Sequence, residues 1–329
     1  MTIRVPDGID PELARTAQLQ PDLDYADPRR ARAGLARATK ISRYARPAQD
    51  ESALAIADRL IPARDGSPDI PVRIYGRSGP ARRSPALVFL HGGAFVAGDL
   101  ELEHVRCVQL ADRTGAVVVS VDYRLAPEHP FPAGVQDCYD ATVWTASHAD
   151  ELGIDSALLA VGGISAGGAL ATAVAMMARD LAGPPLILEM LLYPVIDDAM
   201  ATVSMRTFFD TPGWNQPNSV HMWRHYLGAD GGEVSPYAAP TRATNLSDLP
   251  PAYVLTAEFD PLRDEGIDYA VRLLTAGIPT ELHQFRGTFH GFDAAAPVAA
   301  CSVRALDEQC AVLRRAFEQS RPPTGVDRT

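Results

Sequence analysis

The chain has 329 residues, of which 47% are hydrophobic, and its formal net charge is -11 at pH 7. This length and apolar content are sufficient for the buried core of one large domain with an appended piece. The acidic excess argues against nucleic acid as a partner, because binding a polyanion requires a concentrated basic face.

The first 50 residues contain two helix-like segments, "PELARTAQLQ" and "RRARAGLARATK", and no strand. We predict that residues 1–50 form an N-terminal helical cap segment. Residues 1–20 are polar and lack the apolar core of a signal peptide. The longest apolar runs, such as residues 186–193, fall short of the roughly 20 residues that a membrane span needs. We therefore expect a cytoplasmic protein with no membrane span.

From residue 51 onward, strand-like runs alternate with helix-length segments. Runs such as "ALVFL" and "AVVVSV" are apolar throughout, which is typical of strands covered by helices on both faces. The pattern predicts an α/β fold with a mostly parallel central sheet, built from residues 51–196 and 250–319, followed by a flexible tail over residues 320–329. The predicted strands are residues 72–75, 86–90, 116–121, 157–161, 186–192, 252–256 and 281–285.

Residues 197–249 form a long excursion between two predicted strands. Excursions of this length in a compact domain usually have a function, and sites in such sheets lie at the strand ends. We therefore predict a cap insertion over residues 197–249. Its aromatic and sulfur-containing side chains either line a substrate pocket or pack the core of the cap itself. The pocket candidates are Phe208, Phe209, Trp214 and Met222, with Trp223 nearby in the sequence.

The four cysteines are scattered without CxxC or Cys/His ligand spacing, so we expect reduced core thiols and no metal. They are Cys107, Cys138, Cys301 and Cys310.

A glycine-flanked serine lies between a predicted strand and an alanine-rich segment, in "LLAVGGISAGGALATAV". The motif Gly163-Ile164-Ser165-Ala166-Gly167 is a G-x-S-x-G turn, in which glycines permit a tight corner and the serine hydroxyl is exposed as a nucleophile. A phosphate-binding loop is the alternative reading. It is disfavoured because no Lys-Ser/Thr follows Gly167 and no G-x-G-x-x-G is present.

A serine nucleophile requires a histidine base. His290, in the glycine-bracketed "GTFHGF" just past the last predicted strand, is the candidate, with a surface-loop histidine as the alternative. His283 in "TELHQF" is better explained as an ordinary strand histidine.

The acid that orients the histidine is predicted to be Asp260, in "VLTAEFDPLRDEG". An aspartate before proline at a helix start is also a good N-cap, so local stability alone explains it equally. Asp264 and Glu265 suit the first turn of the same helix. The order Ser165, Asp260, His290 matches the chain order of α/β-hydrolase triads, which favours Asp260.

The oxyanion hole is predicted in "LVFLHGGAFVAGD". Consecutive glycines let backbone N–H groups converge on a developing negative charge, and each donor contributes roughly 2.7–4 kcal/mol to lowering the barrier. The predicted donors are the N–H groups of Gly92, Gly93 and Ala166. His91 is expected to hold this loop.

The set "HGGAF", "DYRLAPEHPFPA", "GISAGG", "DPLRDEG" and "HGF" resembles the hormone-sensitive-lipase-like family of esterases within the α/β-hydrolase superfamily. The motifs follow the family's order from residue 91 to residue 292. The resemblance implies an α/β-hydrolase fold with a helical cap, and a serine carboxylesterase that acts on small esters with short to medium acyl chains through an acyl-enzyme. It implies no cofactor, and it is compatible with a homodimer formed through the last strand or helix.

Two residues depart from the family's usual pattern. Ile164 stands where Asp or Thr is common, and Ala94 stands where a third glycine is frequent. Both changes bear on substrate fit more than on reaction class. In "DYRLAPEH…QD", we expect structural roles for Tyr123, Glu128 and Asp137.

Other functions use similar residues. An acyltransferase or amidase would employ the same triad. A non-catalytic ligand receptor could share the capped fold, although it would not need His290.

Overall fold

The computed structural model describes residues 4–45, 50–64, 66–77, 83–228 and 232–320. Its centre is an eight-stranded sheet in the order β1-β2-β4-β3-β5-β6-β7-β8. The strands are β1 (Leu54–Ile61), β2 (Ile70–Arg77), β3 (Ser84–Leu90), β4 (Val117–Val121), β5 (Ile154–Ile164), β6 (Glu189–Leu192), β7 (Ala252–Phe259) and β8 (Thr280–Phe289).

The strand order has a switch point between β3 and β5. β1 and β2 are antiparallel to their neighbours, and all strands from β4 across to β8 are parallel. The chain passes from β3 to β4 on one side and then to β5 on the other. Ligands bind at such switch points, outside the carboxyl ends of the strands. Leu90 pairs in register with Gly163, so the turns that follow β3 and β5 emerge side by side.

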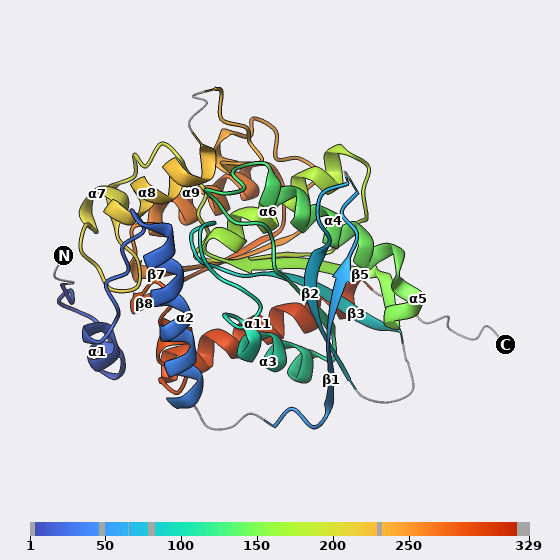
Figure 1. Cartoon of the computed structure of the whole chain (residues 1–329), viewed down its shortest axis with the longest axis horizontal. Helices are drawn as coiled ribbons and strands as arrows, with labels where there is room; N and C mark the ends of the chain where they lie inside the picture. Colours follow the sequence, from blue (N-terminus) through green and yellow to red (C-terminus); the bar gives the residue numbers. More distant parts are fainter. Residues whose placement is uncertain (1–3, 46–49, 65, 78–82, 229–231, 321–329) are drawn as a thin grey trace.

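Helices cover both faces of the sheet (Figure 1). One face carries α4 (Ala133–Ser147), α6 (Ala166–Asp180) and α9 (Arg263–Thr275), and the other carries α3 (His104–Thr114) and α11 (Ala300–Gln319). Helix α6 is buried from Ala166 through Ala178, and its small side chains allow close packing on the sheet. The short helices α5 (Ala149–Leu152) and α10 (Phe292–Ala295) complete this part.

Two segments far apart in the sequence form a cover beside the sheet. They are the N-terminal helices α1 (Pro11–Gln18) and α2 (Pro28–Ala45), and the region with α7 (Val203–Thr207), α8 (Gln216–Leu227) and the 3₁₀ turn η1 (Pro240–Arg242). Asn218 joins them, since its Nδ2 donates to the Leu23 carbonyl at 2.9 Å and its Oδ1 accepts from the Tyr25 N–H at 3.3 Å.

All seven predicted strands are present, so the predicted α/β class is confirmed. Strand β1 was not among the predicted strands. Only Leu54 and Ile61 of this edge strand are buried, so it lacks the apolar run that identified the others. All four cysteines are buried and free. Most of the predicted tail, residues 321–329, lies outside the described residues.

Candidate active site

Ser165 occupies a sharp corner between β5 and α6, with φ 58° and ψ -118°. A side chain at the flanking glycines would collide with backbone: a Cβ at Gly163 would lie 2.2 Å from the Gly167 carbonyl oxygen, and one at Gly167 would lie 2.0 Å from that of Leu90. A non-glycine residue in this conformation costs on the order of 1–3 kcal/mol. The surrounding packing maintains a strained corner that presents Ser165.

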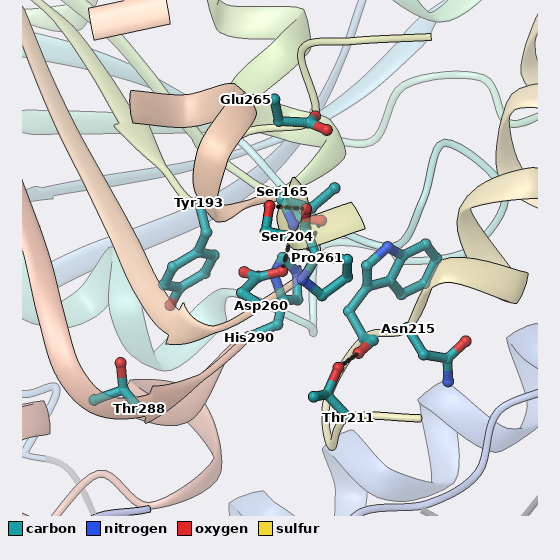
Figure 2. A network of polar contacts seen from close by, with 12 residues as sticks. Ser165, Tyr193, Ser204, Thr211, Asn215, Asp260, Pro261, Glu265, Thr288 and His290 are labelled. Atoms are coloured by element: carbon teal, nitrogen blue, oxygen red, sulfur yellow. Dashed lines mark hydrogen bonds and ion pairs between the residues drawn. The ribbon is translucent and has the colours of Figure 1, made fainter. Parts of the chain in front are cut away.

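His290 and Asp260 converge on this serine from two neighbouring strands (Figure 2). The Nε2 atom of His290, just past β8, lies 3.0 Å from Ser165 Oγ, and its Nδ1 lies 2.7 Å from Asp260 Oδ2. Asp260 follows β7 and is completely buried. Because Asp260 accepts at Nδ1, the neutral histidine has Nε2 free to accept the serine proton.

The second oxygen of Asp260 bonds backbone at the start of the following helix, which is the capping role that the sequence also suggested. Oδ1 accepts from the Leu262 N–H at 2.9 Å, although α9 itself begins only at Arg263. One carboxylate therefore fixes both the backbone at the helix start and the histidine.

Asp264 and Glu265 lie in the first turn of α9, as predicted, but their side chains bond elsewhere in the backbone. Asp264 Oδ2 accepts from the Ser204 N–H at 2.7 Å, which ties α7 to α9. Glu265 Oε1 accepts from the Ile196 N–H at 2.7 Å, and burial raises the pKa of Glu265 well above its usual value. Asp264 therefore connects α9 to the cover at α7, and Glu265 connects α9 to the backbone that follows β6.

The glycine turn after β3 lies against Ser165. A Cβ at Gly92 would lie 3.6 Å from Ser165 Cβ. Gly93 has φ 111°, and a Cβ there would lie 2.0 Å from the Ala97 carbonyl oxygen. Ala166 is the first residue of α6, where helical N–H groups have no partner within the helix. Of the three predicted oxyanion donors, Ala166 directly follows Ser165, Gly92 lies against it, and Gly93 is the next residue of the same turn.

His91 supports this turn from inside the protein. Its Nδ1 lies 2.6 Å from the Gly92 carbonyl oxygen, and its ring stacks on Tyr123 with centroids 4.2 Å apart. Burial lowers the pKa of His91 to about 4, so it is neutral near pH 7. Nδ1 must carry the proton to donate to a carbonyl. These contacts agree with the expectation that His91 holds the glycine turn in place.

Comparison with known proteins places this arrangement in a family. A family model of the α/β-hydrolase fold matches residues 87–294. Esterase LipI of Mycobacterium tuberculosis is 41% identical over 232 residues, 70% of this chain and 72% of the relative. The chain belongs to the hormone-sensitive-lipase-like family of α/β hydrolases.

A second curated relative and a solved structure are similar to a larger part of this hormone-sensitive-lipase-like chain. Carboxylesterase NlhH of Mycobacterium tuberculosis is 38% identical over 273 residues, 80% of this chain and 83% of the relative. The solved structure titled "Bacterial Heroin Esterase" has a TM-score of 0.90 and 42% identity, and the match covers 94% of this chain and 98% of that one.

The family's "DYRLAPEH" segment serves as scaffolding in this hydrolase, as predicted. The Tyr123 hydroxyl donates to the His91 carbonyl at 2.9 Å. Asp137 pairs with Arg124 at 2.7 Å. Glu128 pairs with Arg32 of α2.

Arg32 also bonds the backbone beside the glycine turn. Its Nε donates to the Val96 carbonyl at 2.7 Å, and its Nη2 donates to the Ala126 carbonyl at 2.9 Å. Arg32 could not be predicted from the sequence, because nothing local in an arginine-rich helix distinguishes one arginine from the next. One guanidinium therefore links the N-terminal cover of this hydrolase to the loop after β3.

The four pocket candidates have different environments. The Trp214 ring centroid lies 6.2 Å from that of His290, and Met222 is fully buried. Phe208 packs on Phe259 with ring centroids 6.1 Å apart, and Phe209 is 49% exposed. Of the four, Trp214 is the one with a ring contact to the histidine.

Two aromatic residues near the site were not among the predicted site residues. Phe95, directly after the glycine turn, stacks on Tyr226 of α8 with centroids 3.7 Å apart. Tyr193, directly after β6, has its ring centroid 4.9 Å from that of His290. The position of Tyr193 at the carboxyl end of a parallel strand was the available signal.

Within the described part of the chain, no group of three or more His, Cys, Asp or Glu side chains is arranged to hold a metal ion. No helix among these residues is long and apolar enough to cross a bilayer.

Proposed function

We propose that the protein hydrolyses carboxylic esters through a covalent acyl-enzyme formed on Ser165. The observation that carries this proposal is the continuous contact from Ser165 Oγ to His290 Nε2 at 3.0 Å and from His290 Nδ1 to Asp260 Oδ2 at 2.7 Å. Relatives named esterase and carboxylesterase support the reaction class.

In the acylation step, His290 takes the hydroxyl proton as Ser165 Oγ attacks the ester carbonyl. The carbonyl oxygen becomes an oxyanion, which the N–H groups of Gly92, Gly93 and Ala166 stabilise. Asp260 holds the histidine tautomer and stabilises the imidazolium. When the tetrahedral intermediate collapses, the carbon–oxygen ester bond breaks and His290 gives its proton to the leaving alkoxide.

In the deacylation step, His290 removes a proton from water, and the resulting hydroxide attacks the acyl carbon. A second tetrahedral intermediate forms in the same oxyanion site. Its collapse breaks the bond to Ser165 Oγ, returns the proton to the serine and releases the carboxylic acid. These steps require only side chains, backbone N–H groups and water, so we propose no cofactor.

The substrate is proposed to be a small ester with a short to medium acyl chain, held under a cap formed by residues 1–50 and 197–249. The contact of Trp214 with His290 supports this cap, as do the bonds between Asn218 and residues 23–25. We further propose a cytoplasmic homodimer. The position of β8 at the sheet edge supports pairing through the last strand, and four free cysteines suit a reducing compartment.

Hydrolysis of p-nitrophenyl esters of increasing acyl length tests this function in the wild type and in Ser165→Ala. The wild type should turn over short and medium chains fastest, and the variant should lose turnover while its circular dichroism spectrum stays unchanged. Near-normal hydrolysis by folded Ser165→Ala would refute the proposal. Cys138→Ala, a buried substitution on α4, is the control that should retain turnover.

A further inference from the structure

A second buried carboxylate lies three residues after His290. Asp293, in α10, is 7% exposed and lies on the same turn of chain as the histidine. The Tyr193 hydroxyl donates to its Oδ1, and Arg106 Nη1 donates to its Oδ2 at 3.0 Å. The Ala294 N–H also donates to Oδ1 at 2.9 Å.

Arg106 joins this carboxylate to two long helices. Its Nε donates to Glu103 Oε2 at 2.8 Å, beside the start of α3, and its Nη1 donates to Gln309 Oε1 of α11 at 3.0 Å. Burial opposes ionisation of Asp293, yet Arg106 outweighs that effect and holds the pKa of this carboxyl below its usual value. Breaking a buried charge pair is strongly destabilising, so these contacts fix the turn in one position.

Tyr193 connects the network to the histidine ring. Its ring lies edge-on to that of His290, with ring centroids 4.9 Å apart and an interplanar angle of 60°. The tyrosine backbone is also constrained, since its N–H donates to the Leu255 carbonyl at 2.6 Å and its φ is 35°. The ring is therefore anchored at both ends, by the backbone near β7 and by the hydroxyl on Asp293.

We infer that Tyr193 and Asp293 are positioning residues for His290, with Arg106 holding Asp293 in place. Asp260 and Ser165 contact the two ring nitrogens of the imidazole, and these contacts at the ring edge do not prevent the ring from tilting about the line that joins them. The Tyr193 ring limits this motion, and Asp293 fixes both that ring and the turn carrying the histidine. This inference rests on the proposed function, because it assigns the network a task in the reaction of His290.

Tyr193→Phe is the most selective test, since it keeps the ring and removes the hydroxyl that bonds Asp293. Misplacement of a reacting group by about 1 Å costs up to roughly a hundredfold in rate. We expect kcat for a p-nitrophenyl ester to fall roughly tenfold to a hundredfold while KM stays within about twofold, because the substitution leaves the ester-binding surface unchanged. Asp293→Asn should act in the same direction, and the double variant should lose little more than the worse single one.

Tyr75→Phe is the matched control. Tyr75 is fully buried, and its hydroxyl bonds a side chain, His104 Nδ1, at 3.1 Å on the face of the sheet covered by α3. This variant also loses one buried hydroxyl contact, so it measures the purely structural cost. It should keep the wild-type kcat.

The proton in the hydrogen bond between His290 Nδ1 and Asp260 gives a second readout, which is its downfield resonance in the proton NMR spectrum. We expect its resonance to shift or broaden in Tyr193→Phe and to stay unchanged in Tyr75→Phe. The inference is overturned if folded Tyr193→Phe matches Tyr75→Phe in kcat and in this resonance, or if the single effects of Tyr193→Phe and Asp293→Asn simply add. These outcomes differ from failure of the proposed function, in which wild type and Ser165→Ala would show the same turnover.

Discussion

The two ends of the parallel strands contain buried carboxyl groups in opposite situations. At the carboxyl end of β7, Asp260 is fully buried and both oxygens are bonded, to the Leu262 N–H at 2.9 Å and to His290 at 2.7 Å. At the amino end of β6, Glu189 is equally buried, but no described group bonds either oxygen in ordinary hydrogen-bond geometry. Burial raises the pKa of Glu189 to about 8, so it is mostly uncharged at pH 7.

The surroundings of these two acids explain the difference. Asp260 lies where turns and helix starts supply N–H donors, whereas Glu189 lies near the side chains of Thr172 on α6 and Tyr269 on α9. An unpartnered buried polar group costs roughly 1–3 kcal/mol. The carboxyl end of β7 therefore keeps Asp260 bonded at both oxygens, while Glu189 at the amino end of β6 is buried with a raised pKa.

The largest expected effect at the carboxyl end comes from His290→Ala. Loss of the base should lower kcat/KM for esters by roughly 10⁴-fold or more, and because it leaves the buried Asp260 without its partner, the free energy of unfolding should fall as well. Steady-state kinetics and urea unfolding measure the two quantities. His283→Ala on β8, the strand that leads to His290, is the control, since His283 pairs with Glu308 and stacks on Phe285 instead. Equal losses of kcat/KM in both variants would contradict the assignment of His290 as the base.

Gly93→Ala should have the next largest effect. The added methyl group would lie 2.0 Å from the Ala97 carbonyl oxygen, so the turn must move and its N–H donors move with it. We expect kcat/KM to fall roughly 10²–10³-fold, the loss seen when one oxyanion donor is removed. Gly277→Ala separates the backbone cost from the collision, because Gly277 also has positive φ, 82°, but an added methyl meets nothing within 4 Å. Wild-type kinetics in Gly93→Ala would rule out the assigned oxyanion turn.

At the amino end, Glu189→Gln should alter stability rather than activity. The folded-state pKa of Glu189 is raised from 4.5 to about 8, so the wild type loses stability as pH rises through this range, where the unfolded chain is already ionised. Glutamine does not titrate. The variant's stability advantage in urea unfolding should therefore grow from pH 5 to pH 8, by roughly 3–4 kcal/mol.

Glu281→Gln provides the reference for this pH dependence, because the Glu281 side chain is 56% exposed on β8. Its unfolding free energy should run parallel to that of the wild type between pH 5 and pH 8. If the unfolding free energy of Glu189→Gln also ran parallel to that of the wild type, the raised pKa of Glu189 at the amino end of β6 would be contradicted.

The smallest expected effect on stability comes from Arg32, which links the N-terminal cover to the loop that contains the glycine turn. Arg32→Ala removes two bonds to backbone carbonyls and the pair with Glu128, but the Arg32 side chain is 32% exposed, so its loss should cost only about 1 kcal/mol of stability. Thermal unfolding should register this loss. Arg30→Ala on the same helix should cost nothing measurable, since the Arg30 side chain is 78% exposed. Indistinguishable melting of the two variants would refute the link.

The sequence predicted features that depend on local pattern. The apolar strands, the G-x-S-x-G corner and the chain order of Ser165, Asp260 and His290 are all readable over short stretches. The edge strand β1 escaped prediction because its middle residues are exposed and its apolar pattern is weak. The roles of Ser165, Asp260 and His290 in the reaction remain predictions that the experiments above test.

Contacts between distant parts of the chain could not be predicted in this way. Arg32 reaches carbonyls 64 and 94 residues away, and Tyr193 bonds a carboxylate 100 residues further along. Each depends on how helices and strands pack in three dimensions, and neither side chain differs locally from others of its type. Similarly, Glu265 reads as a helix-start acid, whereas packing buries it against the Ile196 N–H.

The most direct test of the account is labelling of the wild-type protein with a serine-reactive phosphonate, with p-nitrophenyl ester turnover followed in parallel. The account predicts one label per chain, located at Ser165 by mass spectrometry, and loss of turnover in proportion to labelling. Turnover that persists after Ser165 is fully labelled, or a label located on another residue as activity disappears, would contradict it.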